Sequence, residues 1–172
     1  MLLQYLKIKE NDQKKKARLF YNKIIKEVEH FTKKSNFSLK NEFNTTFELT
    51  IMLLFIVFHI NKSNFKEINQ YIMDIFIEDL DFSFRKIGIG DMSIGKYVKK
   101  HVNKIYFRFK KFEKIFKDNN FDDFEFFLSK IDILKSNEKQ DEFSVYLYEY
   151  IKNNLKKTNL KESSFFLLVD SM

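Results

Sequence analysis

The 172-residue chain contains no cysteine, no proline and no tryptophan, and only three glycines. Without cysteine it cannot form a disulfide, a zinc–thiolate site, an iron–sulfur cluster or a cysteine nucleophile. Without proline, the glycines are the only residues that clearly favour a sharp turn, and Gly88, Gly90 and Gly95 all lie within eight residues. Long hydrophobic runs are missing too, because the longest, residues 49–58, is about half of the roughly 20 residues that span a bilayer. That run predicts a buried core helix.

Positive and negative charges are unevenly distributed along the chain. The net charge is +7, with +7 in residues 1–40, −4 in residues 41–93, +7 in residues 94–118 and −3 in residues 119–172. Two basic segments predict a surface that faces an anionic partner, although the lysine enrichment expected from an AT-rich genome is an alternative explanation. The first residues resemble neither a secretory signal nor an organellar transit peptide, so a cytoplasmic protein is expected.

Apolar residues recur at helical spacing through almost the whole chain, and no segment alternates convincingly with a period of two. The pattern predicts helices over about 14–31, 45–60, 65–87, 91–117, 121–134 and 142–155, followed by a short apolar tail at 165–169. The predicted fold is therefore all-α, a single-domain bundle of about six helices over residues 14–172, with a flexible N-terminal segment at 1–13.

The turn residues indicate how these helices begin and end. Thr45 and Glu48 fit a capping box at the start of the second helix. Gly88 is predicted to end the third helix in the left-handed conformation, and Asp91 to cap the fourth. Gly95 is predicted to let another segment of the chain approach closely.

The fourth predicted helix has two contrasting faces. At 100° per residue, one third of its circumference is apolar, and lysines cover the opposite side. Phe107 falls in the middle of the lysine side. An aromatic residue among cations is typical of a contact surface for nucleic acid, a membrane or a polypeptide, whereas a lysine face alone is usually just solvated.

The glycine segment also matches part of a phosphate-binding loop. Residues 90–96 fit the first seven positions of that pattern, but Tyr97 replaces the serine or threonine that would hold magnesium. The preceding residues read as a helix where a phosphate loop needs a strand, and Asp91 would repel phosphate. A turn between two helices is the favoured interpretation.

Other chemical patterns are incomplete. Ser93 and Lys96 have the S-x-x-K spacing of acyl-enzymes, without the accompanying elements. Glu27 and His30 have di-iron spacing, but neither His59 nor His101 supplies the second motif that such a site needs. The acidic clusters at 79–81 and 122–125 have ordinary surface explanations, with Asp81 placed to pair with Arg85. The sequence therefore predicts no catalytic residue, no metal site and no cofactor, and a protein that is not an enzyme.

The glycine segment belongs to a longer motif. Residues 81–100 follow the pattern D-x-x-x-R-x-x-G-[IV]-G-D-x-S-[IV]-G-K-x-V-K-K, with Phe47 and Glu48 before it and Tyr106 and Arg108 after it. This run resembles the signature of the ubiquinol–cytochrome c reductase chaperone family in its bacterial form, and the similarity covers roughly residues 18–117.

The resemblance implies an all-helical assembly factor that acts on newly made cytochrome b on the way to respiratory complex III. Mitochondrial relatives work at the ribosome and the inner membrane, so the implied partners include the ribosome, the anionic inner-membrane surface and a small partner subunit, but no DNA. The implied location is cytoplasmic and peripheral on the inner membrane. The expected partner-binding residues are Gly88, Gly90, Asp91, Gly95, Lys96, Lys99, Lys100 and Phe107. A basic RNA- or ribosome-binding module unrelated to respiration is the rival hypothesis.

Overall fold

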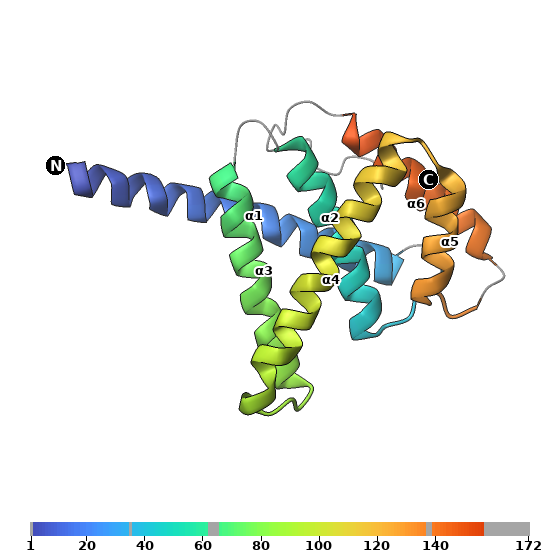
Figure 1. The fold of residues 1–172 in the computed structure, drawn as a ribbon, viewed down its shortest axis with the longest axis horizontal. Coiled ribbons are helices and arrows are strands. Elements are labelled where there is room, and N and C mark those ends of the chain that lie inside the picture. The colour runs from blue at the N-terminus through green and yellow to red at the C-terminus, as the bar shows by residue number, and fades with distance from the viewer. Residues whose placement is uncertain (1, 35, 62–65, 137–138, 157–172) are drawn as a thin grey trace. The chain divides into compact units, whose positions relative to one another are not determined.

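The computed structural model describes residues 2–34, 36–61, 66–136 and 139–156. These residues form six helices and no strand, which confirms the predicted all-α class (Figure 1). The helices are α1 (Leu2–Lys34), α2 (Phe43–Ile60), α3 (Lys66–Lys86), α4 (Asp91–Lys117), α5 (Phe121–Ile131) and α6 (Gln140–Leu155). The predicted apolar tail at 165–169 lies outside the described residues.

The helices group into two compact units. The first contains α3, the part of α1 up to Lys23 and the part of α4 up to Phe107. The second contains α2, α5, α6 and the remaining parts of α1 and α4. Both α1 and α4 contribute residues to each unit, in agreement with the predicted single-domain bundle of about six helices.

In the first unit, α3 and α4 form an antiparallel helical hairpin with a short turn at one end (Figure 1). Phe84 of α3 is buried and contacts α4 through the rings of Tyr97, at 5.9 Å, and His101, at 4.7 Å. Tyr21 of α1 donates a 2.6 Å hydrogen bond to Asp79 of α3. The hairpin is thus held by its own aromatic contacts and tied to α1.

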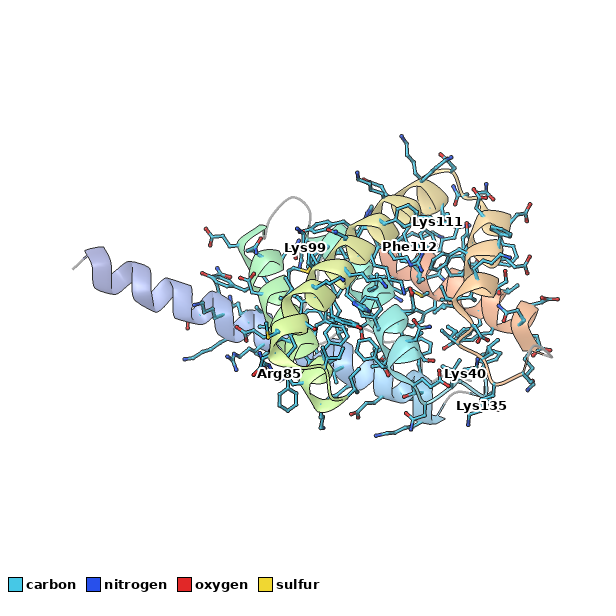
Figure 2. The ribbon with its side chains drawn as sticks, turned by 60° about the horizontal axis from the view of Figure 1, so that its bottom comes forward. Lys40, Arg85, Lys99, Lys111, Phe112 and Lys135 are labelled. Carbon is cyan, nitrogen blue, oxygen red and sulfur yellow. The ribbon has the colours of Figure 1, made fainter. Side chains whose placement is uncertain are left out.

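The second unit has α2 at its centre. Twelve of the eighteen residues of α2 are buried, and α6 packs against both α2 and α5. Phe55 of α2 contacts three rings of α4, and Phe112 among them is fully buried and also meets Phe127 of α5 at 5.1 Å. Figure 2 labels Phe112 on α4. Phenylalanine rings thus supply contacts between these helices.

Helix α2 is also the one described helix that is long and apolar enough to span a membrane by length and composition. Two thirds of that span is buried within the structure, in agreement with the predicted core helix.

The segments that flank α2 and α5 are joined by a short antiparallel bridge between Leu39 and Leu134. The backbone N–H of Lys40 donates to Ile133 and that of Lys135 to Ser38, both at 2.8 Å; Figure 2 shows Lys40 and Lys135 near each other. The predicted helix over 121–134 ends earlier, at Ile131, because Asp132 adopts a left-handed conformation with φ 47°.

The predicted capping box at Thr45 is wrong. Helix α2 begins two residues earlier, at Phe43, and Thr45 lies buried inside it with a hydroxyl that has no hydrogen-bond partner. Glu48 is directed to a different contact, an ion pair with Arg108 of α4.

Helix α1 is longer than predicted. The apolar stripe that includes Ala17, Ile24 and Phe31 is buried as expected, but the helix begins at Leu2. Helical structure thus extends over residues that the sequence assigned to a flexible segment. The flexibility of residues 1–13 and the boundary at residue 14 remain predictions.

Candidate functional site

The predicted turn between the third and fourth helices is the turn between α3 and α4. Gly88 has φ +88°, the left-handed conformation that a residue without Cβ adopts at low cost. The N–H of Ile89 bonds to the carbonyl of Phe84 and the N–H of Gly88 to that of Arg85, both at 3.0 Å. This pair of bonds is a Schellman motif, which satisfies the last carbonyl groups of a helix. The predicted glycine C-cap is confirmed.

Helix α4 begins differently from the prediction. Gly90 occupies the capping position, because its carbonyl accepts from the N–H groups of Ser93, at 2.9 Å, and Ile94, at 3.2 Å. Asp91 is the first residue of the helix, and its carboxylate pairs with Arg85, which also bonds to Asp81 at 2.7 Å. Asp91 therefore links the two helices instead of capping one of them.

Arg85 thus lies between two carboxylates, and the predicted pairing with Asp81 is confirmed. The hydrogen bond that Arg85 donates to the carboxylate of Asp81 makes the largest contribution and raises the pKa of Arg85. Both ends of the turn are held by the same guanidinium, which Figure 2 labels at the end of α3.

Gly95 does not serve close approach. A Cβ added at Gly95 would meet nothing within 4 Å, and the same is true of Gly90. No other segment of the described chain lies within contact distance of this position, so the prediction that Gly95 admits a neighbouring segment is wrong.

The two glycines provide a matched pair of substitutions. Gly95→Ala is expected to raise the free energy of unfolding by about 1 kcal/mol, because alanine favours the helix and has room for its methyl group. Gly88→Ala is expected to lower it by about 1–2 kcal/mol, because of the positive φ. Urea unfolding of the two variants measures both changes, and equal signs would contradict these assignments.

The basic face of α4 lies on its exposed side. Lys96, Lys99 and Lys100 are all exposed, and Phe107 is exposed to 62%; Figure 2 labels Lys99 on this helix. The opposite side is buried at Ile94, which is 3% exposed. The structure thus brings the three lysines and the aromatic ring to one surface of the first unit, as the periodicity predicted.

A group of exposed apolar residues beside this face was not predicted from the sequence. Phe82, Ile87 and Met92 are exposed to 60%, 61% and 102%, and Tyr97 to 42%. They lie at the end of α3, in the turn and at the start of α4. Ile87 and Met92 lie next to the glycines, at positions outside the apolar stripes of the helices. This combination is the sequence signal that could have identified them.

The second unit contains a further functional candidate, formed by the motif residues Glu48 and Arg108. Glu48 is fully buried, and Arg108, 15% exposed, donates to it through Nε at 3.2 Å and Nη2 at 3.1 Å. The guanidinium also lies over the ring of Phe127, 4.6 Å from its centroid. Two signature positions 60 residues apart therefore form one bidentate ion pair, whose role is to hold α2 and α4 together.

The other polar candidates have structural partners. Glu27 accepts a 2.9 Å hydrogen bond from buried Tyr150, and Asp79 accepts one from Tyr21. Within the described ranges, no three side chains among histidine, aspartate and glutamate gather as metal ligands. The segment before the glycine turn is helix α3, which is not the strand that a phosphate-binding loop follows.

Comparison with known proteins places these features in context. Residues 35–126, which include α2, α3 and α4, match the family described as ubiquinol-cytochrome C chaperone. The fold is similar to the crystal structure of the Cbp3 homolog from Brucella abortus, with a TM-score of 0.74 and 20% sequence identity, over 91% of this chain and 89% of that one. A search among curated proteins found no match to this sequence.

Proposed function

Because the chain belongs to the ubiquinol-cytochrome C chaperone family, we propose that it is a non-enzymatic assembly chaperone of ubiquinol–cytochrome c reductase whose client is newly made cytochrome b. The observation that carries this proposal is the family match over residues 35–126. This range contains the glycine turn, the exposed lysines of α4 and the buried Glu48–Arg108 pair. The proposed function consists of binding the client protein, and no catalytic step is assigned to this chain.

The basic face of α4 suits attachment to an anionic surface. Lys96, Lys99 and Lys100 are exposed on one helix, so their ammonium groups can approach phosphates without rearrangement of the fold. Both the ribosome and the inner leaflet of the membrane are anionic, and a client membrane protein meets both. We place the chain in the cytoplasm, attached peripherally where cytochrome b is made and inserted.

Reversal of this charge tests the surface. Lys96→Glu, Lys99→Glu and Lys100→Glu together are expected to weaken attachment by about a hundredfold or more, because each lysine near an anionic surface contributes about 1 kcal/mol. Cytochrome b is expected to accumulate to several-fold lower levels in cells with this variant, as measured by immunoblot of membranes.

The control is a second triple reversal at exposed lysines of the other unit, Lys135, Lys139 and Lys156. It changes the net charge equally and should leave cytochrome b unchanged. Circular dichroism checks that both variants retain their helices. Normal cytochrome b levels with the α4 variant would overturn the surface assignment.

One observation favours the rival function, a basic RNA- or ribosome-binding module unrelated to respiration. Phe107, 62% exposed, projects from the lysine side of α4, and bases stack on aromatic rings among cations. A general defect in translation on deletion of the gene would support this alternative.

A further inference from the structure

The tip of the α3–α4 hairpin presents apolar side chains to solvent. Ile87 in the turn is exposed to 61%, and Met92, in the first turn of α4, is exposed to 102%, as much as in an extended chain. Phe82, one turn before the end of α3, is exposed to 60%. Such a group of exposed large apolar side chains marks an interaction surface.

The same tip is basic. Lys86, Lys96, Lys99 and Lys100 are exposed, and Lys86 lies over the ring of Phe82, 5.7 Å from its centroid. The nearby carboxylates of Asp81 and Asp91 are both engaged by Arg85, as described above, which reduces the negative charge presented there. Lys86 and Lys96 thus lie within four residues of Ile87 and Met92, respectively, and Lys99 and Lys100 lie further from the tip along α4.

We propose that this tip docks on an anionic lipid bilayer, with Ile87 and Met92 entering the interface and the lysines binding headgroup phosphates. This inference rests on the proposed function for the basic surface of α4 and names its partner as lipid. Peripheral elements that combine an apolar edge with lysines bind membranes in this way, with the apolar part buried about 5–10 Å. Phe82 and Tyr97 then lie at headgroup level, where aromatic side chains are favoured.

The side chains favour lipid over the other anionic surfaces. Ile87 and Met92 are aliphatic and have no planar face on which bases could stack, so they would gain little from RNA. A second copy of the chain would bring its own lysines against these lysines, and like charges repel. A bilayer provides the apolar interior and the phosphates together.

The absence of tryptophan from the chain allows a direct test of insertion. Met92→Trp places a single fluorescent indole at the tip, and Val145→Trp places a matched indole at a 51%-exposed position of α6. Both full-length variants are mixed with vesicles of phosphatidylglycerol and phosphatidylcholine, or of phosphatidylcholine alone. The fluorescence of the Met92→Trp variant is expected to shift to the blue and to be quenched by brominated acyl chains only with the anionic vesicles. The fluorescence of the Val145→Trp variant is expected to stay unchanged.

Vesicle flotation of the otherwise unlabelled chain separates the two contributions. Ile87→Ser with Met92→Ser is expected to weaken binding about tenfold or more, because it removes the apolar part at exposed positions. Lys96→Gln with Lys99→Gln and Lys100→Gln is expected to weaken it by a similar factor, and more salt should weaken binding of the wild type. Circular dichroism checks the fold of each variant.

Two results would overturn the inference. One is an unchanged emission spectrum of the Met92→Trp variant with anionic vesicles, and the other is binding to ribosomal RNA with no binding to vesicles under the same conditions. These measurements contain no client protein, so their failure leaves the assembly function intact. A separate result, normal levels of complex III in cells that lack the chain, would contradict the assembly function.

Discussion

Arg108→Ala is expected to lower the free energy of unfolding by about 3–5 kcal/mol, because it leaves the carboxylate of Glu48 buried without its guanidinium partner. Glu48 is fully buried on α2 between the buried residues Phe47 and Leu49, so the folded chain gives its carboxylate little access to water. The substitution also removes the contact of the guanidinium with the ring of Phe127. Urea unfolding followed by circular dichroism measures the change.

The chain offers a matched control for this substitution. Arg85 also binds carboxylates, but its side chain is 50% exposed, so Arg85→Ala should destabilise the protein much less than Arg108→Ala. A double variant, Glu48→Met with Arg108→Met, should recover much of the lost stability because it removes both charges and keeps apolar volume. If Arg108→Ala and Arg85→Ala destabilised the protein equally, the buried pair would not have the role assigned to it.

Alkaline pH is expected to destabilise the protein through Tyr21 and Tyr150. Burial raises the pKa of both phenols, and their hydrogen bonds to Asp79 and Glu27 raise it further. Above about pH 10 the unfolded chain releases these protons while the folded chain keeps them. Their contribution is therefore complete below pH 10 and declines by about 1.4 kcal/mol per pH unit for each tyrosine as the pH rises.

The stability of phenylalanine variants between pH 9 and pH 11.5 tests this origin. Tyr21→Phe and Tyr150→Phe each remove one titrating group, so each should make the fall of stability with pH shallower, and the double variant shallower still. The same variants are compared at pH 7, where the phenols of both states are protonated and only the lost hydrogen bond contributes. A slope that remained as steep in the double variant would assign the alkaline loss to other groups.

Local sequence patterns predicted the helices well where both ends carry a signal. Gly88 was recognisable as a cap because no other residue type in this chain adopts a left-handed turn so readily, and the structure places it at φ +88°. The start of α1 could not be found in this way. No proline or glycine near residue 14 breaks the helix, and Asn11 and Asp12, which could have capped it, lie inside it, so the helix continues toward Leu2 beyond the buried stripe.

The Glu48–Arg108 contact was beyond the reach of local reasoning. Glu48 lies three residues after Thr45 and matched a capping box, which is a pattern of neighbours. Its true partner is 60 residues away and is reached only when α2 and α4 pack together. Periodicity assigns faces to helices, but it does not say which face meets which.

The candidate site was predicted in part for the same reason. The spacing of Lys96, Lys99 and Lys100 placed them on the exposed face of α4, where the structure has them. The exposure of Ile87 and Met92 was not foreseen, because apolar side chains are expected to be buried and neither belongs to a stripe. Gly95 was assigned a close neighbour, but only the folded chain shows that this side of the helix is open.

The amount of cytochrome b and the rate of ubiquinol oxidation in membranes from cells that lack this chain test the assembly function most directly. Both are expected to fall together while the synthesis of other proteins proceeds at its usual rate, and re-expression of the chain should restore them. Unchanged ubiquinol oxidation, or an equal loss of all newly made proteins, would contradict a role in the assembly of ubiquinol–cytochrome c reductase.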